Sequence, residues 1–246
     1  MALTLQMIGT GSAFAKKYFN NNALLRAGAF TLLIDCGITA PMALHQLNVD
    51  VADIDALLIT HLHADHAGGL EELAFRMRFV HRRRPLLYIA EPLAEPLWEN
   101  CLKAGMEDEE YRSLDQYFQV VTMREGEPCR IVDGLEIELM RTDHVPGKLS
   151  YGLLINRSVY YSGDSLLNRE RLESLVHHRG VRLIFHDCQL QGPPSVHATL
   201  DQLLALPEHL QSRIFLMHYG DDKDQYVGRT GRMSFVEQHR LYTLEP

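Results

Sequence analysis

The chain has 246 residues, of which 46% are hydrophobic and 23% charged, a balance that is typical of globular proteins. Its net charge of −8 argues against a general nucleic-acid binder, and the lack of any run of 18 apolar residues argues against a membrane-spanning helix. The four cysteines are far apart and form no Cys-x-x-Cys pair, so we expect no disulfide framework and a reducing, cytoplasmic location.

Strand-like segments recur along the chain, with helical segments between them. We expect strands over residues 3–8, 31–34, 56–60, 86–90, 135–139, 151–155, 159–162, 181–185 and 214–217. We expect helices over residues 70–77, 93–104, 166–176 and 199–206. This pattern predicts an α/β sandwich with helices outside and two mostly antiparallel sheets inside. No repeat or long linker divides the sequence, which indicates a single domain over residues 1–246.

The clearest chemical signal directly follows the apolar strand at residues 56–60. His61, His63, Asp65 and His66 occur there in the order His-x-His-x-Asp-His. His61 and His63 are two residues apart, so their side chains point the same way in an extended chain, and the turn into the next helix re-aims Asp65 and His66. One short loop can therefore offer two pairs of ligands to two adjacent metal ions. The alternative is a polar loop whose histidines only make hydrogen bonds.

Three more candidate ligands follow later strands, namely His144, Asp164 and His218. Each alone would more often be a cap or a surface group. Together with the first loop they form a set of seven nitrogen and oxygen ligands. Such a set favours zinc, with manganese or iron as alternatives.

This motif, with the His, Asp and His that follow it, resembles the metallo-β-lactamase superfamily from Leu3 to His218. The resemblance implies a four-layer αβ/βα sandwich of two mixed sheets flanked by helices. It implies two metal ions that share a water, lower its pKa to about 7 and so provide the attacking hydroxide. It also divides the ligands, with His61, His63 and His144 on one metal, Asp65, His66 and His218 on the other, and Asp164 bridging the two.

Within the superfamily, the chain most resembles the ribonuclease Z-like phosphodiesterases. The resemblance is carried by the Gly-Thr-Gly loop at residues 9–11, the asparagine run at 20–22, Asp187 after a strand, and His197. It implies that Asp65 and His197 are catalytic and that His197 protonates the leaving group. Asp187, where the family usually has Glu, could orient His197. Purely structural roles for His197, at a helix start, and for Asp187 stay open.

The long arm that grips transfer RNA in ribonuclease Z is absent, because only a short hairpin separates His144 from Asp164. With the acidic net charge, this makes transfer RNA an unlikely partner and favours a small phosphodiester such as a cyclic nucleotide. The alternatives are a lactonase or thioesterase of the same fold, and a non-catalytic metal-binding or sensor protein. Relatives in this branch often dimerise, so a homodimer is possible, and Glu91–Phe118 could be a lid, a dimer face or core.

A basic cluster occurs in residues 76–84, where five arginines lie at and beyond the end of a predicted helix. We interpret it as a solvated helix end, because cations are favourable near the carboxyl end of a helix dipole. The other interpretation is a patch that grips phosphate groups.

Overall fold

Two seven-stranded sheets form the centre of the structure, a computed structural model that describes residues 3–244. The first sheet contains β1 (Leu3–Met7), β2 (Ala23–Ala27), β3 (Phe30–Ile34), β4 (Ala56–Ile59), β5 (Leu86–Ala90), β6 (Gln119–Met123) and β14 (Leu241–Leu244). The second contains β7 (Pro128–Val132), β8 (Leu135–Thr142), β9 (Ser150–Ile155), β10 (Val159–Tyr161), β11 (Leu183–Asp187), β12 (Ile214–Met217) and β13 (Ser234–Phe235).

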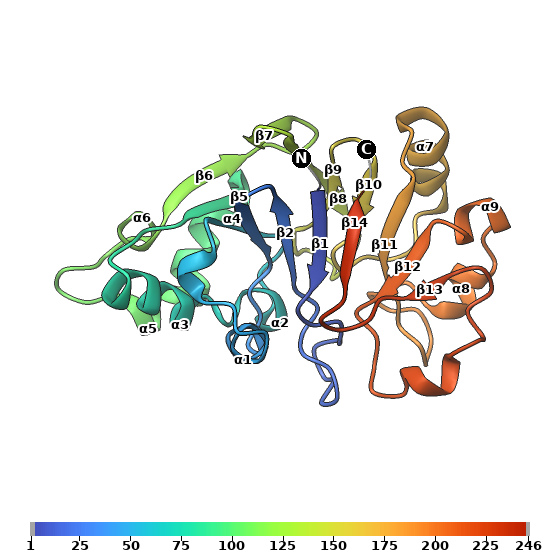
Figure 1. Cartoon of the computed structure of the whole chain (residues 1–246), viewed down its shortest axis with the longest axis horizontal. Helices are drawn as coiled ribbons and strands as arrows, with labels where there is room; N and C mark the ends of the chain where they lie inside the picture. The colour runs from blue at the N-terminus through green and yellow to red at the C-terminus, as the bar shows by residue number, and fades with distance from the viewer. Residues whose placement is uncertain (1–2, 245–246) are drawn as a thin grey trace.

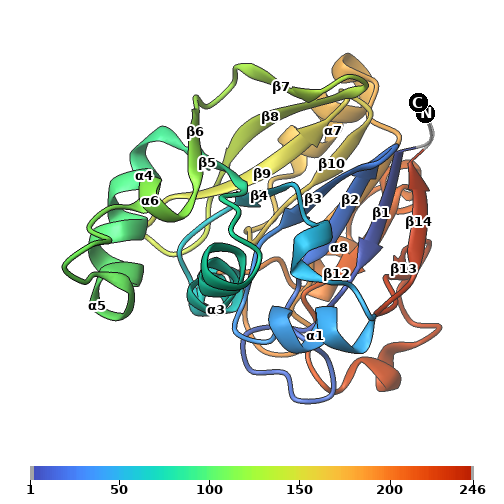
Figure 2. The ribbon, with the colours of Figure 1, turned by 60° about the vertical axis from the view of Figure 1, so that its left-hand side comes forward.

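Helices cover the outer faces of both sheets (Figure 1). Those associated with the first sheet are α1 (Ala40–Gln46), η1 (Val51–Asp53), α2 (Ala64–Ala67), α3 (Leu70–Phe75), η2 (Arg76–Val80), α4 (Glu91–Pro96), η3 (Leu97–Leu102), α5 (Lys103–Met106) and α6 (Leu114–Tyr117). The later ones are α7 (Arg169–Arg179), α8 (Leu200–Leu204), α9 (Glu208–Gln211) and η4 (Lys223–Tyr226). Figure 2 shows α1 and α3 on the near side of the first sheet. Every helix in the described residues is too short or too polar to cross a lipid bilayer.

The strand order is β14-β1-β2-β3-β4-β5-β6 in the first sheet and β13-β12-β11-β10-β9-β8-β7 in the second. In each sheet three neighbouring pairs are antiparallel and three are parallel. The predicted sandwich of two mixed sheets is therefore confirmed, whereas the expectation of mostly antiparallel sheets was wrong. Helical connections such as α1 and α7 carry the chain back along the sheet before the next strand, so those strands run parallel.

Several boundaries differ from the sequence-based expectation. β11 begins at Leu183 rather than at residue 181. α7 begins at Arg169 because the side chain of Asn168 accepts a hydrogen bond from the backbone N–H of Arg171 and caps the helix. The expected helix at residues 93–104 is a succession of α4, η3 and α5.

Segment Glu91–Phe118 contributes to the core. Trp98, Tyr117 and Phe118 are all buried there. The neighbouring basic cluster is in part structural, since Arg83 and Arg84 donate to the backbone carbonyls of Ala52 and Asp115. These contacts support the interpretation as a helix end.

The direction of the strands determines where polar side chains gather. β1, β3 and β4 run the same way in the first sheet, and β8, β10, β11 and β12 run the same way in the second. The loops that follow these strands therefore meet at one edge of the sandwich. β4 is buried along its whole length, which fixes the start of the loop that carries the histidine motif.

Candidate active site

The seven candidate ligands lie close together at this edge, although they come from four separate segments. The ligand atoms fall into two groups, and within each group they all lie within 4.8 Å of one another. The first group is His61, His63, His144 and Asp164, and the second is Asp65, His66, Asp164 and His218. Asp164 belongs to both groups, as a bridging ligand would. Their role as ligands stays a prediction.

The nitrogens of the first group are spaced as a tetrahedral metal requires. Nδ1 of His63 lies 3.0 Å from Nε2 of His61 and 3.2 Å from Nε2 of His144. Zinc–nitrogen bonds of about 2.0–2.1 Å in a tetrahedral arrangement would place the nitrogens roughly 3.3 Å apart. Burial lowers the pKa of all three imidazoles, most strongly that of His61. Neutral imidazoles are the form that binds metal, so these residues fit a cation.

The second group contains buried polar atoms that lack a hydrogen bond. Nε2 of His66 and Oδ1 of Asp164 are 3.2 Å apart, yet neither makes a hydrogen bond within residues 3–244. Burial raises the pKa of the Asp164 carboxyl, but the imidazoles of His218 and His66 outweigh it and hold that pKa well below its usual range. Buried atoms without a partner are costly. A divalent cation between them would supply the missing interaction.

Four of these imidazoles are also contacted through their second ring nitrogen. The pairs are His61 with the hydroxyl of Thr60 (3.1 Å), His66 with Asp35 (2.7 Å), His144 with the carbonyl of Val196 (2.7 Å) and His218 with Asp187 (3.3 Å). Outer partners of this kind orient the ring and select the nitrogen that carries the proton. The other nitrogen is then free to face a metal.

Asp35 is a site residue that the sequence analysis missed. It directly follows β3, has a left-handed backbone with φ of 58°, and is fully buried. Its carboxylate accepts hydrogen bonds of 2.8 Å from the N–H and the hydroxyl of Thr60, and the Nδ1 of His66 lies 2.7 Å away. The available signal was its position, since an acidic residue follows an apolar strand here just as the candidate ligands follow theirs.

The segment after β3 also lies against the backbone of the histidine loop. A Cβ at Gly37 would lie 1.9 Å from the carbonyl oxygen of Asp65, so only glycine allows this approach. Asn22 connects the same two segments, because its side chain accepts from the N–H of Gly37 and donates to the carbonyl of Asp65.

His197, which is partly exposed, pairs with the buried Asp187 beside the two groups. Nδ1 of His197 lies 2.7 Å from Oδ2 of Asp187, and the His197 ring is 4.9 Å from the rings of both His144 and His218. Burial lowers the pKa of His197, but the charge of Asp187 and its hydrogen bond outweigh burial, so this pKa is raised overall. The geometry allows Asp187 to orient His197 as a proton donor. The catalytic roles of His197 and Asp65 stay predictions.

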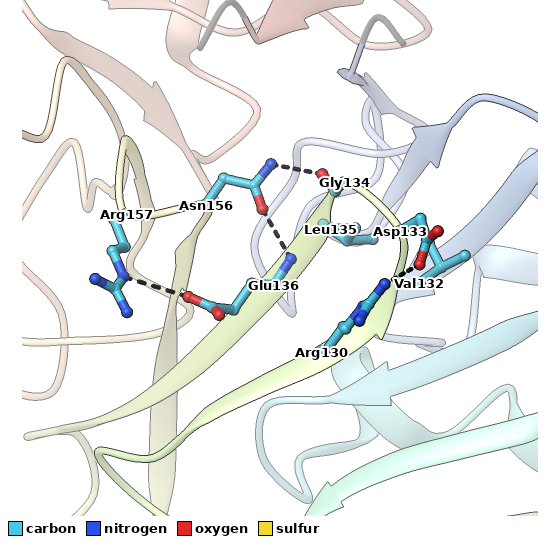
Figure 3. A pocket seen from close by; sticks show the side chains of 8 residues that line it. All are labelled: Arg130, Val132, Asp133, Gly134, Leu135, Glu136, Asn156 and Arg157. Atoms are coloured by element: carbon cyan, nitrogen blue, oxygen red, sulfur yellow. Dashed lines mark hydrogen bonds and ion pairs between the residues drawn. The ribbon is translucent and has the colours of Figure 1, made fainter.

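Two cavities of similar size flank the cluster. One, of about 430 Å³, is lined by His197 and His218, and the other, of about 450 Å³, by His61 and His63. A further surface cavity of about 560 Å³ lies at the opposite edge of the sandwich (Figure 3). It contains the exposed ion pairs Arg130–Asp133 and Arg157–Glu136 and is far from the histidines.

Comparison with known proteins places the chain in a family. The profile of a family described as "Anti-Pycsar protein Apyc1" matches residues 3–242. An anti-Pycsar protein Apyc1 from Paenibacillus sp. (strain J14) is 58% identical over 245 residues, covering 99% of this chain and all of that protein. Another, from Bacillus phage vB_BsuM-Goe3, is 42% identical and covers 96% of each chain. The chain belongs to the anti-Pycsar protein Apyc1 family.

Solved structures show the fold of this family member. The metallo-β-lactamase fold protein YhfI from Bacillus subtilis has a TM-score of 0.77 at 15% identity, covering 99% of this chain and 100% of its own. A diphosphatase from the PhnP family has a TM-score of 0.75 at 20% identity, covering 99% and 98%. The predicted metallo-β-lactamase fold is confirmed. The predicted enzyme class, a metal-dependent hydrolase, agrees with these neighbours, one of which is described as a diphosphatase.

Proposed function

We propose that this single domain, residues 1–246, hydrolyses a small phosphodiester, with cyclic nucleotides as the substrate class, at a centre that binds two metal ions. One observation carries the proposal. Two four-residue groups of ligand atoms share Asp164, and the His197–Asp187 pair lies directly beside them. The name anti-Pycsar, which relatives in bacteria and in phages carry, is compatible with the removal of a small molecule.

The two groups would hold the metals as the superfamily resemblance implies. His61, His63 and His144 would bind one ion, Asp65, His66 and His218 the other, and Asp164 both. Zinc suits this set of donors, and a similarly folded PqqB from Methylobacterium extorquens is described as Zn(2+)-bound. Two such ions would lower the pKa of a bound water and polarise a phosphoryl oxygen.

The protein's own side chains would handle the protons. His197 is oriented through Nδ1 by Asp187, so its Nε2 can protonate the oxygen that leaves phosphorus. Burial raises the pKa of Asp65, but His66 and His218 outweigh it and keep the carboxylate ionised. Its Oδ2, 3.3 Å from Nε2 of both histidines, can accept a hydrogen bond from water.

The short segment between His144 and Asp164 favours a small substrate. It contains β9 and β10 joined by a tight turn in which Asn156 and Arg157 have positive φ, and no arm extends from it. Both cavities beside the cluster fall in the range of about 300–1,000 Å³ that is usual for small ligands. A small phosphodiester therefore fits better than transfer RNA.

A substrate panel tests the proposal. Purified protein with zinc or manganese would be given 2′,3′- and 3′,5′-cyclic nucleotides, bis-p-nitrophenyl phosphate and an acyl-homoserine lactone. We expect hydrolysis of a cyclic nucleotide that is lost on chelation and restored by metal. Cleavage of the lactone alone would favour the lactonase alternative, and bound metal without hydrolysis of any ester would favour a sensor protein.

The leaving-group role of His197 has its own test. His197→Ala should lower kcat on a cyclic nucleotide by about 10²–10⁴-fold, because the leaving alkoxide needs a proton. The loss on bis-p-nitrophenyl phosphate should be much smaller, because p-nitrophenolate leaves without one. His209→Ala, which changes an exposed histidine outside the site, is the control. Equal losses on both substrates would contradict the assignment.

A further inference from the structure

We propose that the base of the nucleotide substrate binds in the cavity beside His197, stacked on Phe14, and not in the cavity beside His63. This inference rests on the proposed function. It adds an orientation for the substrate and names the residues that would recognise the base.

The first step concerns the side on which the nucleoside must lie. During hydrolysis the oxygen of water forms a bond to phosphorus, the bond from phosphorus to one ribose oxygen breaks, and that oxygen takes the proton of His197. Water loses a proton to solvent, and His197 later regains one from solvent. Because the leaving oxygen is part of the ribose, the ribose lies toward His197. The base, attached to the same sugar, then extends into the cavity that His197 lines.

Phe14 offers this cavity an aromatic surface. Its side chain lines the cavity and is 88% exposed, so its ring is available to a ligand. The loop that carries it is held at both ends. The N–H of Ser12 donates to the carbonyl of Tyr219 at 3.0 Å, and the N–H groups of Lys16 and Lys17 donate to the carboxylate of Asp221 at 2.8–3.0 Å. A base can therefore stack on a ring whose backbone is already positioned.

The rest of this cavity carries groups that can read the edge of a base. The amide of Gln191 donates to the carboxylate of Asp222, and both side chains line the cavity. Gln189 fixes the same loop by donating to the carbonyls of Gln191 and Pro193. Amide and carboxylate groups are suitable donors and acceptors for the polar edge of a base.

The cavity beside His63 has a different character. Its lining includes Pro92, Leu93 and Pro96, and apart from the two histidines of the site the described residues that line it include no aromatic ring. Lys148 is the one cation among them. Such a surface lacks a planar group on which a base could stack.

Steady-state kinetics on the metal-loaded enzyme test the inference. Phe14→Ala should raise KM for a 3′,5′-cyclic nucleotide by about five- to hundredfold and leave kcat within about twofold, because stacking acts on binding. Phe14→Trp should restore KM. The abasic analogue 1-deoxyribose 3′,5′-cyclic phosphate should show the same KM with wild type and Phe14→Ala, because it has no base. Phe79→Ala, at another exposed aromatic residue, should behave as wild type.

Three outcomes would overturn the inference. An unchanged KM in Phe14→Ala together with a raised KM in Asn100→Ala would place the base in the other cavity, which Asn100 lines. An equal rise in KM for the nucleotide and for its abasic analogue would assign the loop a purely structural role. If the wild-type enzyme cleaves phosphodiesters but no cyclic nucleotide, the substrate class of the proposed function fails, and this inference fails with it.

Discussion

At the scale of single residues, the candidate metal ligands depend on hydrogen-bond partners that would not themselves contact a metal ion. Asp35 is fully buried and contacts the centre directly through His66 and, by way of the hydroxyl of Thr60, through His61. Because its carboxylate also accepts from Thr60, it is fixed in position and therefore fixes the imidazole. Such a carboxylate keeps the proton on Nδ1 of His66 and makes Nε2 a better ligand.

We expect Asp35→Asn to weaken metal binding by about 10–100-fold, since the amide is a poorer partner for Nδ1 of His66. The measurement is zinc affinity by competition with a chromophoric chelator. Asp55→Asn is the matched control, because Asp55 accepts from the N–H of Thr31 at the other end of β3, away from the cluster. Equal zinc affinities in the two variants would contradict the role of Asp35.

At the scale of elements, the loops after β3 and β4 act as one unit. Gly37 lies on the carbonyl of Asp65, and Asn22 hydrogen-bonds to both. A side chain at residue 37 would separate the loop that holds Asp35 from the loop that holds the histidine motif. Close backbone contact between elements is thus part of what positions the ligands.

Gly37→Ala should cost about 1–3 kcal/mol of unfolding free energy, because its Cβ meets backbone that cannot move aside. Denaturant unfolding and metal content would be measured together, and both should decrease. Gly105→Ala is the control, since the nearest atoms to its Cβ would be those of the flexible carboxylate of Glu71, and alanine favours the helix at that position by up to about 1 kcal/mol. A Gly37→Ala protein as stable as Gly105→Ala would refute this argument.

At the scale of the whole molecule, the proposed metals would link the two sheets. The motif from His61 to His66 follows β4 of the first sheet, whereas His144, Asp164 and His218 follow strands of the second. Ions shared between the two sets bind the folded state and have no comparable site in the unfolded chain. Metal binding should therefore stabilise the whole fold.

Chelation should lower Tm by about 8–16 °C relative to protein with free zinc at about 1,000 times its Kd. That concentration corresponds to about 4 kcal/mol of stabilisation, and each kcal/mol shifts Tm by about 2–4 °C at this chain length. Scanning calorimetry measures the shift. Asp164→Ala should show little response to zinc, whereas Asp133→Ala, which changes an exposed carboxylate at the opposite edge of the sandwich, should keep the full response. No Tm difference in wild type would refute the link.

The sequence by itself determined the elements whose pattern is local. The sequence alone shows the apolar runs of β3, β4 and β5 and the histidine motif after β4. Each consists of adjacent residues, and the residue types themselves indicate burial or metal binding. The later candidates His144, Asp164 and His218 were found because each follows such a run. The strands β2, β6, β7, β13 and β14 were missed. For β6, β7 and β14 the reason is that their mixed burial depends on the strand beside which they lie.

Only the tertiary structure decided which side chains meet. The contact of Asp35 with His66 joins residues 31 positions apart. The contact of His197 with Asp187 depends on how the loop after β11 folds back onto the end of that strand. The local sequence pattern also could not predict that half of the strand pairs are parallel, because strand direction depends on how helices return the chain along each sheet. Distances between remote residues are set by packing of the whole chain, and no local spacing encodes them.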